Sequence, residues 1–238
     1  EELYIKVKAG TSIKEIEEEL KKKNQQLAFE PIDFGILLGA KSDYGTAGGQ
    51  VACNIAGPRR FKSGSVRDHV LGFRGVNGRG EIIKSGGVVV KNVTGYDLSK
   101  LMCGSFGTLV ALTEITFKVL PAPEESITLV IHNQKIENAL YYLDKSVNSS
   151  NDISGAIFLP KEPDVSGCTM NIENTFKLND LKNDGSITAI RLEGTKKSVK
   201  QRLENLINEL QIKDLSISIL ATHQSEIFWN KVKSLEFF

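Results

Sequence analysis

Glycine is concentrated in one part of this chain, and that concentration limits what the part can fold into. Sixteen of the 21 glycines lie between Gly35 and Gly107, and only four follow Pro121. Because glycine has no Cβ atom, this density indicates turns with positive φ, or places where the backbone approaches another group closely. Val, Ile and Leu are interleaved too often for a flexible linker. We therefore expect a folded, turn-rich region, and Pro121-Ala122-Pro123 predicts a domain boundary after it.

The charge balance and the cysteines exclude several classes of protein. The 238 residues carry 30 basic and 29 acidic side chains, a formal net charge of +1. Such a chain has no overall field to attract nucleic acid, so no nucleic-acid partner is expected. Cys53, Cys103 and Cys168 are widely spaced. This spacing predicts neither a disulfide framework nor a zinc site, and it suits the reducing cytoplasm.

Periodicity and capping signals predict the elements of the first half. Residues 3–8 alternate as a strand, and Ser12-x-x-Glu15 is a capping box that opens a helix. The apolar positions of that helix are Ile13, Ile16 and Leu20. Two β-rich runs, residues 70–76 and 81–84, flank Asn77-Gly78 and predict a hairpin. Residues 109–120 complete this half as a further strand.

After Pro123 the pattern changes to strands alternating with amphipathic helices. The expected order is β-α-β-β-α-β, the ferredoxin-like arrangement, over residues 126–132, 135–147, 153–159, 186–192, 196–210 and 215–220. Residues 160–185 fit it poorly and are expected to add a strand at Cys168–Ile172. The sequence therefore predicts an α+β protein with one domain over residues 1–123 and a second over residues 124–238.

The segment most informative about function is G-T-A-G-G-Q-V-A-C-N-I-A-G-P-R-R, residues 45–60. Its glycines would let the backbone lie against a flat or phosphorylated ligand, with N–H groups free to donate. A purely structural use of these glycines explains the pattern equally well. The chain contains neither the G-x-G-x-x-G fingerprint nor a Walker A loop, so a Rossmann or P-loop nucleotide site is not predicted.

Further motifs follow in a fixed order. They are G-S-V-R-D-H-V-L-G at 64–72, K-N-V-T-G-Y-D-L-S-K-L at 91–101, G-S-F-G-T-L at 104–109 and L-T-E-I at 112–115. Together with residues 45–60, they resemble the FAD-binding domain of the vanillyl-alcohol-oxidase, or p-cresol methylhydroxylase-type, flavoproteins. Within that family, the sequences of these motifs are most similar to those of flavin-binding subunits of bacterial glycolate oxidases. The resemblance is strongest over residues 1–124.

The resemblance implies the fold in more detail. It implies a p-cresol methylhydroxylase-type FAD-binding domain followed by a ferredoxin-like cap domain. The family's first pyrophosphate loop would precede Glu1, and its C-terminal segment would follow residue 238. We therefore expect a partial FAD-binding domain over 1–123 and an incomplete cap over 124–238. Val110 departs from the family, whose members usually carry glycine there.

The resemblance also implies which residues contact FAD. Pro31 borders the flavin; the loop at 45–49 lies along the ring and ribityl chain, and the turn at 54–57 faces the ring. Residues 65–70 lie near the ribityl and pyrophosphate groups, and the main chain of 112–115 meets the adenine end. The implied cofactor-binding residues are Pro31, Gly45, Thr46, Gly48, Gly49, Asn54, Ala56, Gly57, Ser65, Arg67, Asp68, Val70, Leu112, Thr113, Glu114 and Ile115. No catalytic residue and no metal ligand is assigned.

By the same resemblance, the whole protein oxidises glycolate or a similar 2-hydroxy acid to the 2-oxo acid. Hydride passes from C2 of the substrate to FAD, and electrons then pass to an iron–sulfur partner. The implied partners are a second flavoprotein subunit and an iron–sulfur subunit. The implied location of this chain is the cytoplasm, and it would reach the inner face of the membrane only through those subunits. The alternative is a non-catalytic flavoprotein or structural subunit that supports a catalytic sister subunit. A nucleotide-sugar reductase of the same flavin fold is a weaker third interpretation.

Several other residues have ordinary structural explanations. Arg59 and Arg60 could hold an anionic substrate, or they could form a solvated basic turn. Asp97 is expected to cap a helix at 98–102, with Tyr96 packed beneath it. Cys53 and Cys103 are interpreted as buried fillers rather than a covalent flavin link. The scattered His69, His132 and His223 predict no metal site.

Overall fold

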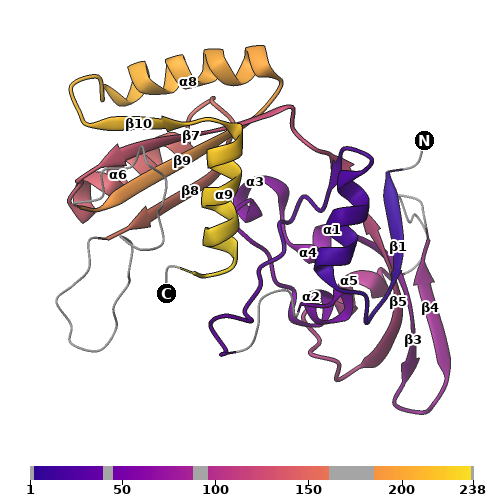
Figure 1. Ribbon diagram of the computed structural model, residues 1–238. Coiled ribbons are helices and arrows are strands. Elements are labelled where there is room, and N and C mark those ends of the chain that lie inside the picture. The colour runs from indigo at the N-terminus through magenta and orange to yellow at the C-terminus, as the bar shows by residue number, and fades with distance from the viewer. Residues whose placement is uncertain (1–2, 40–44, 88–95, 161–184, 237–238) are drawn as a thin grey trace. The chain divides into compact units, whose positions relative to one another are not determined.

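The computed structural model describes residues 3–39, 45–87, 96–160 and 185–236. The chain divides into two compact units (Figure 1). Unit 1 is Glu1–Ala122 with Lys233–Leu235, and unit 2 is Pro123–Val232 with Glu236–Phe238. In the described part of the chain, no helix is both long and apolar enough to cross a membrane.

Unit 1 is built on one antiparallel sheet. Its strands are β1 (Tyr4–Lys8), β5 (Val110–Lys118), β3 (Val70–Asn77) and β4 (Ile82–Gly86), in the order β1-β5-β3-β4. A second, two-stranded sheet pairs β2 (Gln25–Gln26) with β6 (Leu120–Pro121). The strands predicted at both ends of this half and the predicted hairpin are therefore confirmed.

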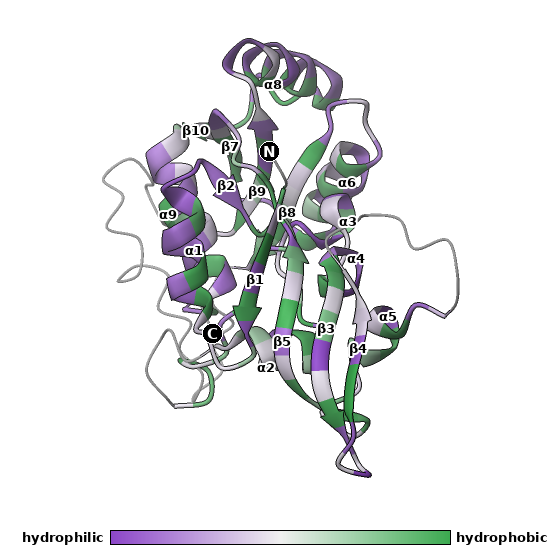
Figure 2. Ribbon diagram, turned by 90° about the vertical axis from the view of Figure 1, so that its right-hand side faces the viewer, coloured by the Kyte–Doolittle hydropathy of each residue, from purple (hydrophilic) through white to green (hydrophobic). Residues whose placement is uncertain are grey.

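The helices of unit 1 cover one face of this sheet. They are α1 (Ile13–Lys21), α2 (Ala47–Cys53), α3 (Arg60–Ser63), α4 (Val66–His69) and α5 (Leu98–Met102). Helix α1 begins as predicted, because the Ser12 hydroxyl accepts a hydrogen bond from the Glu15 N–H at 3.1 Å. Ile13, Ile16 and Leu20 of α1 are buried in a core that includes Phe29, Ile115 and Phe117. The opposite, open face of the sheet is crossed by hydrophilic bands (Figure 2).

The β3–β4 hairpin turns slightly later than the sequence indicates. Asn77 does organise the turn, since its Oδ1 accepts hydrogen bonds from the N–H groups of Arg79 and Glu81. The residue with positive φ is Gly80, at +79°, and not Gly78. A longer loop with an Asx-type bond therefore replaces the tight two-residue turn that an Asn-Gly pair favours.

Unit 2 has the predicted ferredoxin-like order. The elements are β7 (Glu125–His132), α6 (Ile136–Val147), β8 (Ile153–Leu159), β9 (Ile187–Gly194), α8 (Lys196–Leu210) and β10 (Ile217–Leu220). The antiparallel sheet has the order β10-β7-β9-β8, which places each helix crossover over an inserted strand. The strand expected at Cys168–Ile172 lies outside the described residues.

One helix of unit 2 was not predicted. Helix α9 (Thr222–Lys233) follows β10 and packs Phe228, Trp229 and Val232 against Val130 and Leu159 on one face of the sheet. Helix α8 packs against the other face, where a separate core gathers residues of β7, β9 and α8. The sheet of unit 2 is therefore covered on both faces.

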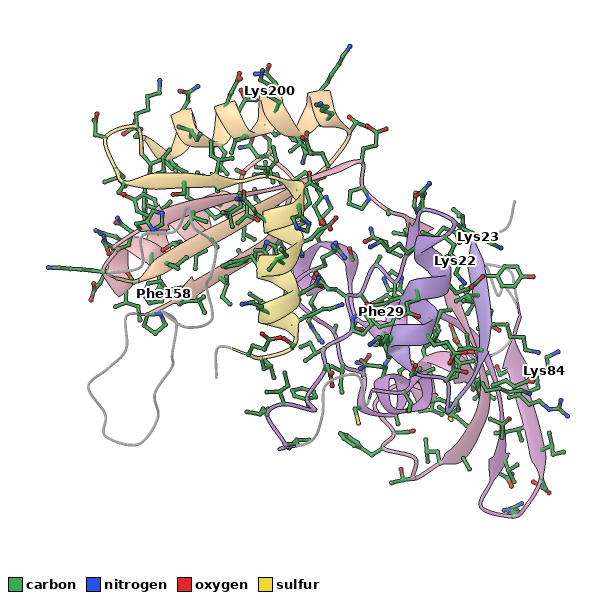
Figure 3. All side chains as sticks on the ribbon, viewed as in Figure 1. Lys22, Lys23, Phe29, Lys84, Phe158 and Lys200 are labelled. Atoms are coloured by element: carbon green, nitrogen blue, oxygen red, sulfur yellow. The ribbon has the colours of Figure 1, made fainter. Side chains whose placement is uncertain are left out.

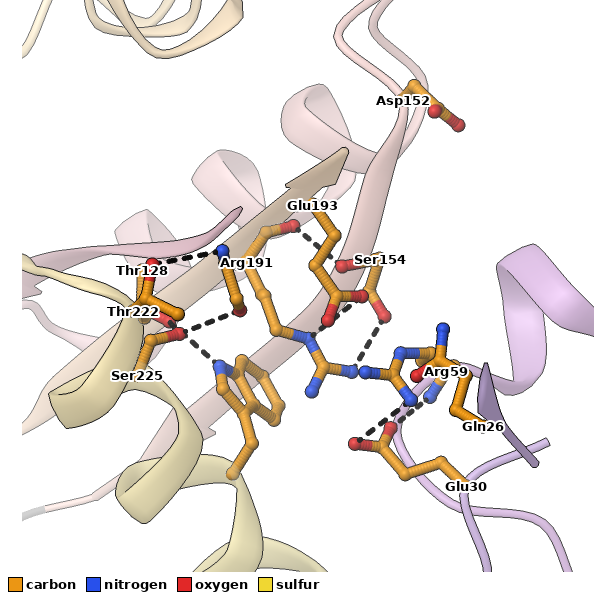
Figure 4. A network of polar contacts seen from close by, with 12 residues as sticks. Gln26, Glu30, Arg59, Thr128, Asp152, Ser154, Arg191, Glu193, Thr222 and Ser225 are labelled. Carbon is orange, nitrogen blue, oxygen red and sulfur yellow. Dashed lines mark hydrogen bonds and ion pairs between the residues drawn. The ribbon is translucent and has the colours of Figure 1, made fainter. Parts of the chain in front are cut away.

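A buried arginine lies on the α9 side of this sheet (Figure 4). Arg191 is 2% exposed, and its guanidinium lies 4.4 Å from the centre of the Trp229 ring. Arg191 Nη2 donates to the Ser154 carbonyl at 3.1 Å, and Glu193 is 3.7 Å from Arg191 Nε. Trp229 in turn donates from Nε1 to Thr128 Oγ1 at 2.8 Å. This charge is therefore engaged by its own unit.

Candidate functional site

The glycine-rich segment forms a helix rather than the open loop that its composition suggests. Residues Ala47–Cys53 form α2, and the Thr46 hydroxyl caps it by accepting from the Gly49 N–H at 3.2 Å. The Ala47 N–H donates to the Thr11 carbonyl at 3.0 Å, and the Gly48 N–H donates to the Ala9 carbonyl at 2.8 Å. The first donors of this helix are thus used inside unit 1, so they are not free for a pyrophosphate group.

Two of the predicted glycines are required by close backbone packing. A Cβ atom on Gly48 would lie 3.0 Å from the Ala9 carbonyl oxygen, and one on Gly57 would lie 2.1 Å from the Glu30 carbonyl oxygen. The space that a side chain would need at these positions is already filled by the chain itself. At Gly48 and Gly57, the structural explanation that the sequence left open therefore accounts for the absence of a side chain.

Gly49 and Gly45 are different. Gly49 is exposed, and Gly45 is half-buried. The nearest heavy atom to a Cβ built on Gly45 would be Gln50 Nε2 at 3.5 Å, an ordinary contact distance. Of the four glycines predicted to cradle a ligand, these two are the ones at which an added Cβ atom would have only side-chain atoms as its nearest neighbours.

A buried amide beside Gly45 has an unused acceptor. Gln50 is 3% exposed, and its Nε2 donates to the Ile32 carbonyl at 2.9 Å. Its Oε1 is buried without a hydrogen-bond partner in the described part of the chain. Pro31, Gly45 and Gln50 line one hollow of about 50 Å³. An orphaned acceptor beside a hollow is what an absent ligand with N–H donors would satisfy, so these residues fit such a group.

Asn54 and Arg67 join two of the predicted segments. Asn54 ends α2 in the left-handed conformation, with φ 52°. Its Oδ1 accepts from the Arg67 N–H at 3.1 Å. Lys100 Nζ from α5 donates to the carbonyl oxygens of Arg67 and Val70. The structure therefore brings the end of α2, all of α4 and the start of β3 together, as the sequence motifs imply.

Ser65 and Asp68 form the cap of α4. The Asp68 carboxylate accepts from the Ser65 N–H at 2.7 Å and from the Ser65 hydroxyl at 3.0 Å. The hydrogen bond from the Ser65 backbone lowers the pKa of Asp68. Both side chains thus hold the start of α4, through one oxygen of the Asp68 carboxylate.

His69 closes the same helix from within the core. It lies 5.6 Å from Phe29, ring centre to ring centre, and Nε2 donates to the Ser63 carbonyl at 2.8 Å. Nδ1 is buried and has no partner among the described residues. Burial lowers the pKa of His69, so its neutral form is the folded one. This agrees with the ordinary structural role expected for His69.

The predicted strand segment Leu112–Ile115 does not converge on this site. Strand β5 lies between β1 and β3, and Glu114 is paired with Lys8 on one side and Arg74 on the other. Its main chain is therefore engaged in two ladders rather than free for a ligand. Thr113 lies at an irregularity in the β3–β5 register, and its carbonyl accepts from the Ala9 N–H. Ile115 is in the core, whereas the Glu114 side chain contacts Lys6 and Lys8.

The remaining sequence interpretations have mixed outcomes. Cys103 is buried, and burial raises its pKa to about 11, but Cys53 is exposed, so its interpretation as a buried filler is wrong. The Asp97 side chain accepts from the Lys100 N–H and caps α5 as predicted. Tyr96 is 91% exposed and does not pack beneath that helix. Ala56 is half-buried, and residues 91–95 of the third motif lie outside the described residues.

The basic turn at Arg59 is anchored within unit 1. Arg59 N–H donates to Glu30 Oε2 at 3.0 Å, and the Arg59 guanidinium lies 3.8 Å from Glu30 Oε1 (Figure 4). Arg60 is exposed at the start of α3. The substrate-anion interpretation of this pair therefore applies to Arg60 rather than Arg59.

Sequence reasoning missed two contributors to this region. The loop after α5 reaches the end of α2, where the N–H groups of Gly104 and Phe106 donate to the carbonyls of Val51 and Ala52. The G-S-F-G motif was the available signal for that loop, since both Phe106 and Gly107 have positive φ. Gln50 was missed because nothing in its sequence neighbourhood marks a buried amide. Among the described residues, no group of three or more His, Cys, Asp or Glu could hold a metal ion.

Comparison with known proteins identifies relatives over part of the chain. The glycolate oxidase subunit GlcE of Escherichia coli (strain K12) is 50% identical over 128 residues, 54% of this chain and 35% of that relative. The D-lactate dehydrogenase of Anaerostipes hadrus is 37% identical over 140 residues, 59% of this chain and 28% of that relative. The glycolate oxidase subunit GlcD of Bacillus subtilis (strain 168) is 40% identical over 116 residues, 48% and 23% of the two chains. The matched segments thus span about a third or less of these relatives.

Solved structures support the fold. Two structures of alkyldihydroxyacetonephosphate synthase match with TM-scores of 0.71 and 0.72 at 18% and 20% identity. They cover 98% and 99% of this chain, and the match covers 43% of each of those chains. Residues 1–86 match the family model of an FAD binding domain, the segment that contains α2, α4 and Gln50. The part of the chain that resembles a known family is therefore residues 1–86, which match an FAD binding domain.

Proposed function

We propose that this chain is the flavin-binding part of a dehydrogenase subunit that oxidises glycolate or a similar 2-hydroxy acid. The observation that carries the proposal is the orphaned Gln50 Oε1 beside the hollow lined by Pro31 and Gly45, inside the segment matched by the FAD-binding family. The names of the relatives, which include glycolate oxidase subunits and a D-lactate dehydrogenase, support the substrate class. When bound, FAD would supply the acceptor for hydride from C2 of the substrate.

The predicted residues would hold FAD in two different ways. Contact with FAD would come from Pro31, Gly45 and Gln50, which line the hollow, and from Gly49 and Ala56, which are not buried. The others would shape the site around it. Thr46, Gly48, Asn54, Gly57, Ser65 and Asp68 fix α2 and α4 by the contacts described above, and Arg67 and Val70 are held by Asn54 and Lys100. Because contacts within unit 1 hold α2 and α4 in place, the site would keep its geometry when no ligand is bound.

We assign the two parts of the chain to two tasks. Residues 1–123 would form the FAD-binding domain, in part, and residues 124–238 a ferredoxin-like cap, also in part. The division of the chain after Ala122 and the antiparallel order of the second sheet support this assignment. No residue of unit 2 is assigned a catalytic role.

The proposed protein works with other subunits. Its partners would be a second flavoprotein subunit and an iron–sulfur subunit, and the iron–sulfur subunit would receive the electrons. Two of the relatives, GlcE and GlcD, are named as subunits of glycolate oxidase, which supports a multi-subunit enzyme. By the same proposal the chain acts in the cytoplasm and reaches the inner face of the membrane only through its partners.

The chain could instead be a non-catalytic flavoprotein or structural subunit that supports a catalytic sister subunit. This second function is favoured by the contacts of the buried polar side chains of unit 2. Arg191, the side chain best suited to a substrate carboxylate, is engaged by Trp229 and Glu193. His132 is bonded to the Ser218 hydroxyl at 2.8 Å. These contacts leave neither group free for a substrate.

Anaerobic mixing with glycolate separates the two functions. The protein is loaded with FAD, freed of partner subunits and mixed with glycolate in the absence of oxygen, and the visible absorbance of the flavin is followed. Bleaching of the flavin band is expected if the subunit oxidises the substrate itself. An oxidised flavin that stays unchanged, but is bleached once the sister subunit is added, overturns the catalytic proposal and leaves the supporting role.

A further inference from the structure

The open face of the unit 1 sheet carries a row of charged residues in register across all four strands. Lys8 of β1 lies opposite Glu114 of β5, Glu114 lies opposite Arg74 of β3, and Arg74 lies opposite Lys84 of β4. Lys6 lies on the same face, two residues before Lys8, where its partner across the ladder is Thr116. The cations Lys6, Lys8, Arg74 and Lys84 therefore lie on the same face as the Glu114 carboxylate.

The one carboxylate of the row is fully used by the lysines of β1. Glu114 Oε1 is 2.7 Å from Lys8 Nζ, and Glu114 Oε2 is 2.9 Å from Lys6 Nζ. These bonds, first from Lys8 and then from Lys6, lower the pKa of Glu114 to about 2. Because both carboxylate oxygens are taken, Glu114 does not neutralise the cations on β3 and β4.

Arg74 and Lys84 are left facing each other without an anion. No hydrogen bond or ion pair from the described residues reaches either side chain, and both residues are exposed. Figure 3 shows Lys84 extending outward from the edge strand. Like charges placed directly opposite each other on antiparallel strands destabilise the pair. A bound anion would offset the destabilisation that this pair of like charges causes.

A hollow lies beside these two cations. Its volume is about 100 Å³, and its lining includes Lys6, Arg74, Lys84, Gly72, Gly86 and Glu114. The Glu114 carboxylate in this lining is the one paired with Lys6 and Lys8. It forms where the β3–β5 register shifts between Val70 and Gly72. Gly86 has φ +72°, and a Cβ atom there would lie 2.0 Å from the Leu71 carbonyl oxygen. The backbone therefore forbids a side chain at this point, and the hollow stays next to the cationic groups.

We propose that this hollow binds a dianionic oxyanion of phosphate size. The planar guanidinium of Arg74 can donate two parallel hydrogen bonds to such an anion, and Lys84 and Lys6 add charge from either side. An anion bound between Arg74 and Lys84 would attract both side chains and so offset the repulsion between them. The shared chemistry is the phosphate group, carried either by inorganic phosphate or by a small phosphorylated metabolite. The hollow lies on the face of the sheet opposite the α2 helix, so it is distinct from the proposed flavin site.

Thermal unfolding of the FAD-saturated protein tests this. The Tm is measured with inorganic phosphate, with glycerol phosphate and with sodium chloride at matched ionic strength, for the parent, for the double variant Arg74→Gln/Lys84→Gln and for Arg79→Gln. Arg79 is exposed in the β3–β4 turn and does not line the hollow, so it is the matched control for loss of a charge. Phosphate is expected to raise the Tm of the parent and of Arg79→Gln, and to leave that of the double variant unchanged. A larger rise with glycerol phosphate would identify a phosphorylated metabolite as the source.

The Tm values of the same variants without phosphate show whether the substitutions themselves change the stability of the fold. Without an anion, the double variant should unfold at the parent's temperature or above it, because a repulsion has been removed. A lower Tm in the absence of phosphate contradicts the proposal, as does an equal phosphate effect in the parent and the double variant. A poly-glutamate peptide that raises the parent's Tm at lower concentrations than phosphate would overturn it in favour of an acidic protein partner.

Discussion

Gly57 and Glu30 are in direct backbone contact: a methyl group on Gly57 would come within 2.1 Å of the Glu30 carbonyl oxygen. The Gly57 N–H also donates to the carbonyl of Phe29 at 3.0 Å, so the two segments are tied as well as close. This contact brings the turn after α2 against the segment that leads to Pro31. Two stretches of the candidate site are thus positioned by the absence of a single side chain.

Replacing Gly57 by alanine should therefore destabilise the protein by about 1–3 kcal/mol, the usual cost of forcing a methyl group into filled space. Gly78 is the matched control, because a Cβ atom there would meet nothing within 4 Å. Urea unfolding of the two variants measures the difference. Equal stabilities for Gly57→Ala and Gly78→Ala would show that the contact with Glu30 is not tight.

The left-handed conformation of Asn54 and its bond to Arg67 can be separated by two substitutions. Asn54→Gly keeps φ near 52° without strain but removes the acceptor, at a cost of about 1 kcal/mol. Asn54→Ala removes the acceptor and also forces a Cβ-bearing residue into the left-handed region, which adds about 1 kcal/mol more. Unfolding experiments should rank Asn54→Ala as the less stable. The reverse order would mean that the backbone at this position relaxes on substitution.

Stability should fall as the pH is lowered through the range of histidine titration. Burial lowers the pKa values of His69 and His132, so the folded state prefers the neutral rings. The unfolded chain binds protons near its ordinary pKa of about 6.5, so this stability is present above that pH and is lost as the pH falls below it. His69→Phe should show a shallower decline in unfolding free energy between about pH 8 and pH 5. A decline as steep as that of the parent would show that His69 does not contribute.

The buried Arg191 of unit 2 should be costly to remove by itself. Arg191→Met leaves the buried Glu193 carboxylate without this partner and removes the contact with Trp229, for an expected loss of about 3–5 kcal/mol. The double variant Arg191→Met/Glu193→Gln should recover part of that loss, because no buried charge then lacks its partner. Chemical denaturation measures both. If the double variant is less stable than Arg191→Met, the interaction between the two side chains is not the source of the cost.

Local signals predicted much of the fold. The cap at Ser12, the cap at Asp97 and the β3–β4 hairpin each depend on residues within a few positions of one another, so the sequence contains the whole signal. The ferredoxin-like order of unit 2 was likewise readable, because its strands and helices have clear periods. Helix α9 was not predicted, although the helical spacing of Phe228, Trp229 and Val232 was a signal for it in the sequence.

The candidate site was less predictable, because its geometry depends on contacts distant in sequence. Glycine is a poor helix former, so Gly48 and Gly49 indicated a loop, whereas packing of Gly48 against Ala9 stabilises a helix there. The exposure of Cys53 depends on which face of that unforeseen helix it occupies. Glu114 was assigned with its neighbours as one strand, but alternation along β5 and pairing on both edges separate it from the rest of the site.

The central claim, that the hollow beside Gln50 belongs to an FAD site, is tested most directly by titrating the flavin-free protein with FAD. Binding is followed by the visible flavin band and by the Tm, for the parent, for Gln50→Leu and for the control Gln201→Leu, whose residue is exposed on α8. We predict that FAD raises the Tm of the parent and of the control, and that Gln50→Leu binds FAD at least about tenfold more weakly because the acceptor is lost. A parent that retains no flavin and whose Tm does not respond to FAD, or a Gln50→Leu variant that binds FAD as tightly as the parent, would contradict the account.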